Sequence, residues 1–207
     1  MTSPHHASGV HSVIGVDAGT ATPREADHLI HGLRDRLTLP AGTFACTHLF
    51  RTGERRGATI SLTLPARDAA TRAGTDTVWQ ELLTTLPAGT GLVLGERSHG
   101  PAEAVGTARQ AAAAPPSTGR AVLYPGVEQL TGTVTVADVL DRTAVEHLVV
   151  LGAPAGELPG TTRVWTRNHV RPEWRAGTLT LTLVPAAGGL LAPFEVPNPT
   201  PCCADHD

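Results

Sequence analysis

The first half of the chain changes repeatedly between the apolar spacing of a strand and that of a helix. A short apolar run at 11–16 predicts a buried strand. Thr22 and Pro23 then begin a helix, because a threonine oxygen can accept from the free N–H groups of the first turn and proline has no N–H to leave unpaired. The apolar residues that follow have helical spacing and form one stripe: Ala26, Ile30, Leu33 and Leu37.

The next apolar segments predict a hairpin, a helix and a further strand. Residues 44–51 and 58–64 are two strand candidates, and the glycine-containing residues between them favour a turn. A helix at 75–86 and a strand at 91–96 follow. The resulting order, strand, helix, strand, strand, helix, strand, is typical of the ferredoxin-like split βαβ fold.

The fold class predicted for the whole chain is α+β, with the ferredoxin-like βαββαβ half first and a smaller, strand-rich α/β half after it. A helix pattern at 101–114 closes the first half, and the segment P-P-S-T-G is the clearest linker. Beyond it we expect strands near 121–124, 145–151 and 178–184 and a short helix near 136–141. The predicted division is a mobile arm at 1–9, a ferredoxin-like unit at 10–114, a linker at 115–119, a second unit at 120–192 and a proline-spaced tail at 193–207.

The amino-acid composition limits the kinds of binding site and catalysis that the chain can provide. Only 3% of the residues are aromatic, so leucine, valine and alanine must build the core, and every one of the 16 basic residues is arginine. Without lysine, neither a lysine Schiff base nor a Walker-type lysine contact to phosphate is possible. An anion site would have to use arginine, backbone N–H groups or a metal. The formal net charge of −3 makes a general nucleic-acid binder unexpected.

The sequence also favours a cytoplasmic location. The first residues lack the basic and apolar regions of a signal peptide, no apolar run approaches the length of a membrane span, and three cysteines are few for a secreted disulfide scaffold. We therefore expect no membrane partner. The patterns G-x-S-x-G, H-E-x-x-H, G-x-G-x-x-G and C-x-x-C are all absent, so no enzyme class is indicated.

The cysteines near the carboxyl end are the first candidate site. Cys202, Cys203 and His206 lie within five residues, and Cys46 and His48 are on a predicted strand. If the tail folds onto that strand, these five residues could hold a thiophilic metal ion, zinc or copper. The two adjacent cysteines could instead form a reversible disulfide, or Cys203 could act as a nucleophile through a stabilised thiolate. The alternative is a frayed end with inert thiols.

A basic and aromatic segment, R-V-W-T-R-N-H-V-R, is the second candidate site. Read as one strand, it places five side chains on one face: Arg163, Trp165, Arg167, His169 and Arg171. The arginines and tryptophan could clamp an anionic small molecule, with His169 as acid or base. The alternative is a solvated edge strand whose charges prevent aggregation.

Three functions follow from these patterns. The first is a cytoplasmic metal-binding or thiol-active protein that uses the Cys-Cys-x-x-His cluster. The second is an enzyme or binding protein for an anionic small molecule held by the Arg/Trp/His strand. The third is a homo-oligomeric interaction module that pairs through sheet edges.

Overall fold

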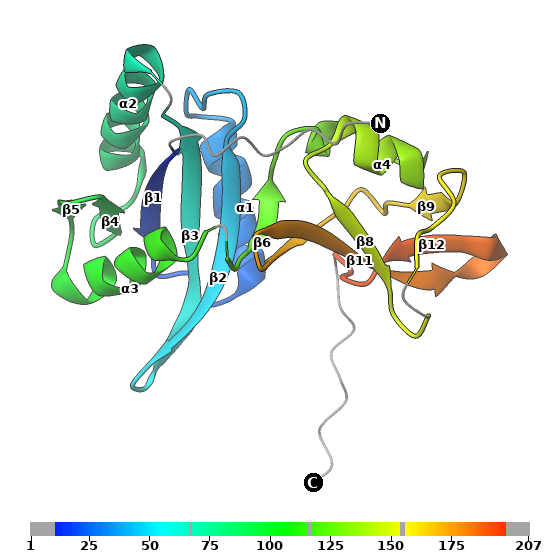
Figure 1. Ribbon diagram of the computed structural model, residues 1–207. Helices are drawn as coiled ribbons and strands as arrows, with labels where there is room; N and C mark the ends of the chain where they lie inside the picture. Colours follow the sequence, from blue (N-terminus) through cyan, green and yellow to red (C-terminus); the bar gives the residue numbers. More distant parts are fainter. Residues whose placement is uncertain (1–10, 67, 116, 154–155, 198–207) are drawn as a thin grey trace, which may run out of the picture. The chain divides into compact units, whose positions relative to one another are not determined.

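Two compact units make up the chain, which a computed structural model describes over residues 11–66, 68–115, 117–153 and 156–197 (Figure 1). The chain has the mixed α+β composition that its sequence predicts. One unit comprises Met1–Pro125 with Trp174–Gly177, and the other comprises Gly126–Glu173 with Thr178–Asp207. The division therefore falls after residue 125, whereas the sequence placed a linker at 115–119. The first unit extends further because a strand at 120–123 pairs with its sheet.

An antiparallel sheet in the order β5-β4-β1-β3-β2-β6 forms the centre of the first unit. Trp174 and Arg175 of β10 (Glu173–Arg175) continue this order beyond β6. The predicted hairpin is present, and its turn is shorter than expected because both strands extend to Thr52 and Arg55. The strands are β1 (His11–Asp17), β2 (Phe44–Thr52), β3 (Arg55–Pro65), β4 (Gly91–Leu94), β5 (Arg97–His99) and β6 (Arg120–Leu123).

Helices α1 (Pro23–Arg34) and α2 (Ala69–Thr85) cover one face of this sheet and share its hydrophobic core. Thr22 caps α1 by accepting from the Glu25 N–H, which confirms the predicted start, and the predicted apolar stripe is buried. Helix α2 begins earlier than predicted because Asp68 and Thr71 form a capping box. The core residues alternate along the strands, as Ile60, Leu62 and Leu64 show on β3.

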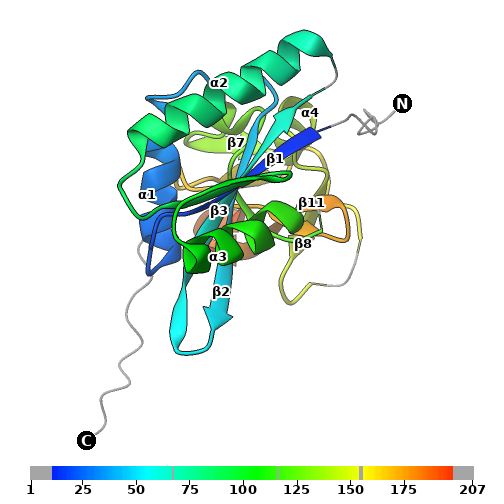
Figure 2. The same ribbon diagram turned by 90° about the vertical axis from the view of Figure 1, so that its left-hand side faces the viewer.

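Helix α3 (Ala102–Ala113) packs on the opposite face, where glycines permit a close approach (Figure 2). A Cβ atom at Gly15 of β1 would lie 1.9 Å from the Ala108 carbonyl oxygen, and one at Gly91 of β4 would lie 2.2 Å from the Ala104 carbonyl carbon. The absence of a side chain at these two strand positions therefore allows the helix to lie this close to the sheet.

The second unit holds a mixed sheet in the order β11-β12-β9-β7, with β8 parallel to β11. Strands β9 and β12 are also parallel, whereas β7–β9 and β11–β12 are antiparallel. Among the described residues, no helix combines the length and apolar character that a membrane span needs. The elements are 3-10 helix η1 (Val127–Gln129), β7 (Thr133–Thr135), α4 (Val136–Arg142), β8 (His147–Val150), β9 (Arg163–Trp165), β11 (Thr178–Ala186), 3-10 helix η2 (Ala187–Gly189) and β12 (Leu190–Pro193).

Candidate functional site

A strained turn follows the short strand β9. The predicted strand over 163–171 is wrong beyond Trp165, because the chain turns at Thr166 and the His169 N–H donates to the Thr166 carbonyl (3.0 Å). The two central residues, Arg167 and Asn168, have φ angles of 54° and 51°. Asparagine tolerates this left-handed conformation, whereas for arginine it costs about 1 kcal/mol or more. Strain of this kind persists only where surrounding contacts impose it.

Gly132 imposes that conformation. Its carbonyl accepts from both the backbone N–H and the hydroxyl of Thr166, each at 2.9 Å, and its N–H donates to Oδ1 of Asn168 at 2.9 Å. The Asn168 N–H in turn donates to the Thr166 hydroxyl (3.2 Å). Thr166 is buried. These four bonds hold the turn in one geometry, so the side chain of Arg167 leaves the backbone in a set direction.

The turn presents Arg167 over an exposed tryptophan. The Arg167 guanidinium carbon lies 5.1 Å from the centre of the Trp165 ring, and 46% of Trp165 is exposed. Arg163, also exposed, is two residues earlier on the same face of β9, while Val164 between them is buried. Within the described part of the chain, neither Arg163 nor Arg167 makes an ion pair. We call Arg163, Trp165 and Arg167 the Arg–Trp platform.

The other two residues of the predicted face lie beyond the turn. His169 has only 14% of its side chain exposed, and its Nε2 lies 3.2 Å from Oε1 of Glu195. Arg171 donates to the Val170 carbonyl (3.2 Å). A single strand face carrying all five residues therefore does not exist, because the turn ends the alternation after Trp165.

Cys46 and His48, the predicted metal ligands on β2, lie on one face of that strand beside Ser61 of β3. Ser61 is the register partner of Cys46, and its hydroxyl lies 2.8 Å from Nε2 of His48. Burial raises the pKa of the Cys46 thiol to about 12, although hydrogen bonds from Trp174 and Ser61 oppose this. Burial also lowers the pKa of His48 to about 4. Cys46 thus keeps its proton at neutral pH, which disfavours it as a thiolate ligand.

Gly119, the last residue of the predicted linker, lies against these two side chains. A Cβ atom at Gly119, whose φ is +127°, would lie 2.5 Å from Cε1 of His48 and 3.1 Å from the Cβ of Cys46. In the residues that the structure describes, no three His, Cys, Asp or Glu side chains form a group that could hold a metal ion. The remaining predicted ligands, Cys202, Cys203 and His206, lie outside the described residues.

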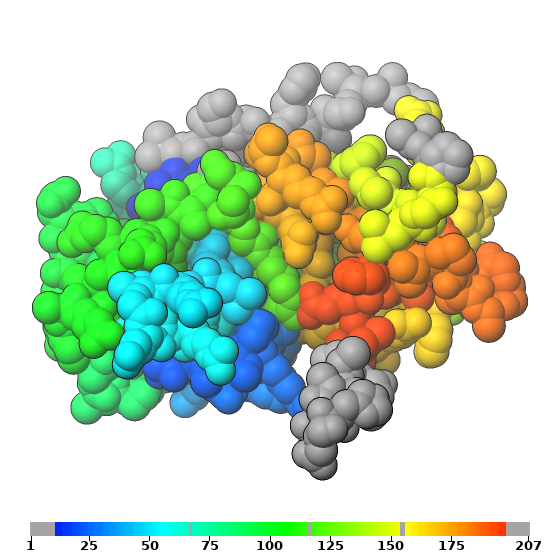
Figure 3. Space-filling view, turned by 90° about the horizontal axis from the view of Figure 1, so that it is seen from below, coloured from blue at the N-terminus to red at the C-terminus, as the bar shows by residue number. Residues whose placement is uncertain are grey.

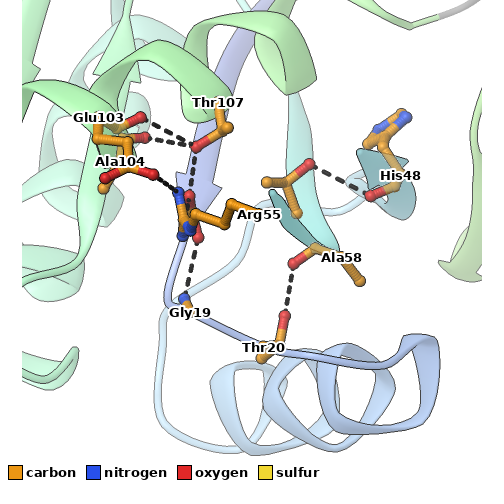
Figure 4. A network of polar contacts seen from close by, with 10 residues as sticks. Gly19, Thr20, His48, Arg55, Ala58, Glu103, Ala104 and Thr107 are labelled. Carbon is orange, nitrogen blue, oxygen red and sulfur yellow. Dashed lines mark hydrogen bonds and ion pairs between the residues drawn. The ribbon is translucent and has the colours of Figure 1, made fainter. Parts of the chain in front are cut away.

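A second polar network surrounds the fully buried carboxylate of Asp17 at the end of β1 (Figure 4). Its oxygens accept from the Gly19 N–H (2.9 Å), from Nη2 of Arg55 (2.8 Å) and from the Thr107 hydroxyl. The carboxylate therefore joins β1, β3 and α3. Donors from three segments already bind the Asp17 carboxylate, so we interpret this network as structural: it holds these elements together.

The sequence reading missed Gly132 and Asn168, which hold the platform turn. The local signal was the asparagine, which favours left-handed turn positions, but the apolar and polar alternation concealed it. No protein family model, no curated protein and no solved structure matches this chain. The geometry of the platform is therefore the basis of the functional conclusion.

Proposed function

We propose that the protein binds a small anionic ligand with a planar ring on the Arg–Trp platform. The proposal rests on the strained turn after β9, which four hydrogen bonds hold in place. This turn places Arg167, which makes no ion pair with the described residues, over the half-exposed ring of Trp165. A solvated edge strand would need only charge at these positions, and would not need a left-handed arginine. The cost in stability supports a functional reason for the geometry.

The chemistry of the platform defines the ligand class. An indole face stacks on flat conjugated rings, and an arginine pairs with carboxylate or phosphate through parallel N–H bonds. Arg163 adds a second positive charge on the same face of β9. The ligand that fits is therefore an aromatic ring bearing a carboxylate or phosphate. We propose binding, and a proton-transfer role for His169 stays a prediction.

The exposed tryptophan provides a direct test. Trp79 and Trp174 are 4% and 6% exposed, so quenching by a bound ring reports mainly on Trp165. We would titrate the protein with aromatic carboxylates and nucleoside monophosphates, with inorganic phosphate as the ligand that cannot stack, and repeat the titrations by calorimetry. Trp165→Leu should weaken binding about tenfold, because stacking contributes about 1–3 kcal/mol.

Arginine substitutions test whether binding needs the planar guanidinium group or only its positive charge. Arg167→Lys keeps the charge but loses the planar group, so it should also weaken binding, whereas Arg142→Lys on α4 should not. Binding that is equal in the wild type, Trp165→Leu and Arg167→Lys would show that the platform is not the site.

For the first unit, we propose a ferredoxin-like arrangement as the underlying fold. The antiparallel order β4-β1-β3-β2, with α1 and α2 sharing one core, supports it. Strands β5 and β6 and helix α3 are then additions to that arrangement.

The other sequence-based hypotheses stay predictions. A metal or thiol role now rests on Cys202, Cys203 and His206, because the buried, protonated thiol of Cys46 disfavours its part in the site. A cytoplasmic location and homo-oligomerisation through sheet edges are likewise predictions. Metal analysis of the full chain and of a chain lacking its last six residues would test the first.

A further inference from the structure

Two arginines face each other near the turn of the β2–β3 hairpin. The strand register places Arg51 directly opposite Arg56, and Thr52 opposite Arg55 just before the turn. Directly opposed residues on one face of an antiparallel pair have Cβ atoms about 5 Å apart, and like charges at that distance destabilise the pair. The hairpin thus carries a local electrostatic cost at its end.

No carboxylate of the described chain relieves this cost. Neither Arg51 nor Arg56 makes an ion pair there, and the same holds for Glu54 in the turn. The adjacent Arg55, in contrast, has partners within the first unit. Its guanidinium binds Asp17 at 2.8 Å and lies 3.7 Å from Glu103 (Figure 4). The same group also stacks 5.0 Å from the centre of the Phe50 ring. Internal partners thus satisfy one hairpin arginine and leave two exposed.

An exposed leucine lies next to the arginine pair. Leu49 is 76% exposed, the highest value among the exposed large apolar side chains of the described residues. It is two residues before Arg51 and therefore on the same strand face. The end of the hairpin extends past the helices of the first unit, and its residues (cyan) are open on the face shown in Figure 3. Charge and apolar surface are therefore both available to one ligand.

We propose that Arg51 and Arg56 bind the phosphate group of an organic phosphate, while Leu49 contacts the apolar part of that ligand. A phosphate monoester carries about −1.5 to −2 charges at neutral pH, so it can neutralise both guanidinium groups at once. A carboxylate would neutralise only one. The phosphate can come from a soluble phosphomonoester or from a phosphomonoester lipid headgroup such as that of phosphatidic acid. This site belongs to the first unit and is independent of the Arg–Trp platform.

Binding and stability together test the proposal. Hexyl phosphate should raise the unfolding temperature of the full chain more than inorganic phosphate does, because only hexyl phosphate reaches Leu49. Arg51→Gln and Arg56→Gln should each abolish the shift, and Leu49→Thr should reduce the response to hexyl phosphate to that of inorganic phosphate. The matched control is Arg109→Gln, which removes an exposed arginine from α3 and should leave the shift intact. Arg167→Lys should also leave the shift intact, so the experiment can reject this site without rejecting the Arg–Trp platform, and the reverse.

The ligand-free variants give a second readout. Arg51→Gln should unfold at a higher temperature than the wild type at low salt, and the difference should shrink as salt is added, because the like-charge repulsion is screened. Arg109→Gln should show no such gain. A purely structural role for Arg51 predicts the reverse sign.

Vesicles distinguish the two sources. Cosedimentation with phosphatidic acid vesicles, but not with neutral phosphatidylcholine vesicles, would assign the site to a lipid headgroup. A response to hexyl phosphate without cosedimentation would assign it to a soluble phosphomonoester. Phosphate-induced stabilisation that is absent in the wild type, or that persists in both Arg51→Gln and Arg56→Gln, would overturn the proposal.

Discussion

At the scale of single residues, burial controls the chemistry of the β2 side chains. Cys46 and His48 lie on one sheet face beside Gly119, and Trp174 contacts the Cys46 thiol. Desolvation disfavours a charge on either group, so the thiol stays protonated and the imidazole stays neutral. Two residue types that often bind metals or react are thereby held in their uncharged forms.

His48 should make stability fall as the solution becomes acidic. Its pKa is 6.5 when unfolded and about 4 when folded, so the unfolded chain binds the proton first. The stability that this group contributes is complete above pH 6.5, declines as the pH falls to about 4, and is then lost. The total change is at most about 3 kcal/mol. Urea unfolding at a series of pH values measures it.

The control for this prediction is His48→Gln, which retains a hydrogen-bond donor and acceptor near Ser61 but does not titrate. Its stability should vary less than that of the wild type between those two pH values. The lowered carboxyl pKa values of Asp68 and Asp138 act in a more acidic range, because hydrogen bonds from their capping partners shift them below 3.8. Parallel pH profiles for wild type and variant would contradict the assignment.

At the scale of elements, glycines decide where α3 can pack. Helix α3 has a weakly amphipathic, alanine-rich sequence, and its buried residues are small: Ala104, Thr107, Ala108 and Ala111. Small side chains contribute little hydrophobic energy each, so the helix depends on close contact with β1 and β4. Gly15 and Gly91 permit that contact.

Two alanine substitutions should therefore have opposite effects. Gly15→Ala should destabilise the protein by about 1–3 kcal/mol or more, because its Cβ would overlap the Ala108 carbonyl, which belongs to a backbone that cannot rotate away. Gly106→Ala, within α3, has no atom within 4 Å of its Cβ. It should stabilise by about 0.5–1 kcal/mol through helix propensity. Chemical unfolding of both variants measures the difference, and equal effects would contradict this account of α3 packing.

At the scale of the whole molecule, the chain returns to the first unit after leaving it. The segment Trp174–Gly177 belongs to that unit although the preceding residues belong to the other. The Trp174 N–H donates to the Gly119 carbonyl (2.9 Å), and its ring lies 5.5 Å from that of Phe44. A residue late in the chain thus completes a core that the early residues begin.

Trp174→Ala should accordingly destabilise the first unit by about 3–5 kcal/mol, since a large buried ring is removed. It should also speed the alkylation of Cys46, measured by mass spectrometry of the peptide that contains it. Trp165→Ala, which removes a half-exposed ring, should cost about 1 kcal/mol or less and leave that rate unchanged. Slow alkylation of Cys46 in both variants would show that Trp174 does not protect it.

Local sequence determined the elements of this protein. Thr22-Pro23, the alternation on β3 and the stripe of α1 predict their elements because the signals lie within one turn or one strand pair. The three-residue strands β5, β7 and β10 were not predicted, because three residues carry too little periodicity. The strand β12 was not predicted either.

Only the tertiary structure decided the candidate sites. Arg167 enters a left-handed turn because Gly132, distant in sequence, bonds Thr166 and Asn168. The Cys46 thiol stays protonated because burial beside Gly119, Ser61 and Trp174 raises its pKa. The composition and spacing of residues therefore determine which side chains are available, whereas long-range contacts decide which of them are buried, paired or left exposed to a ligand.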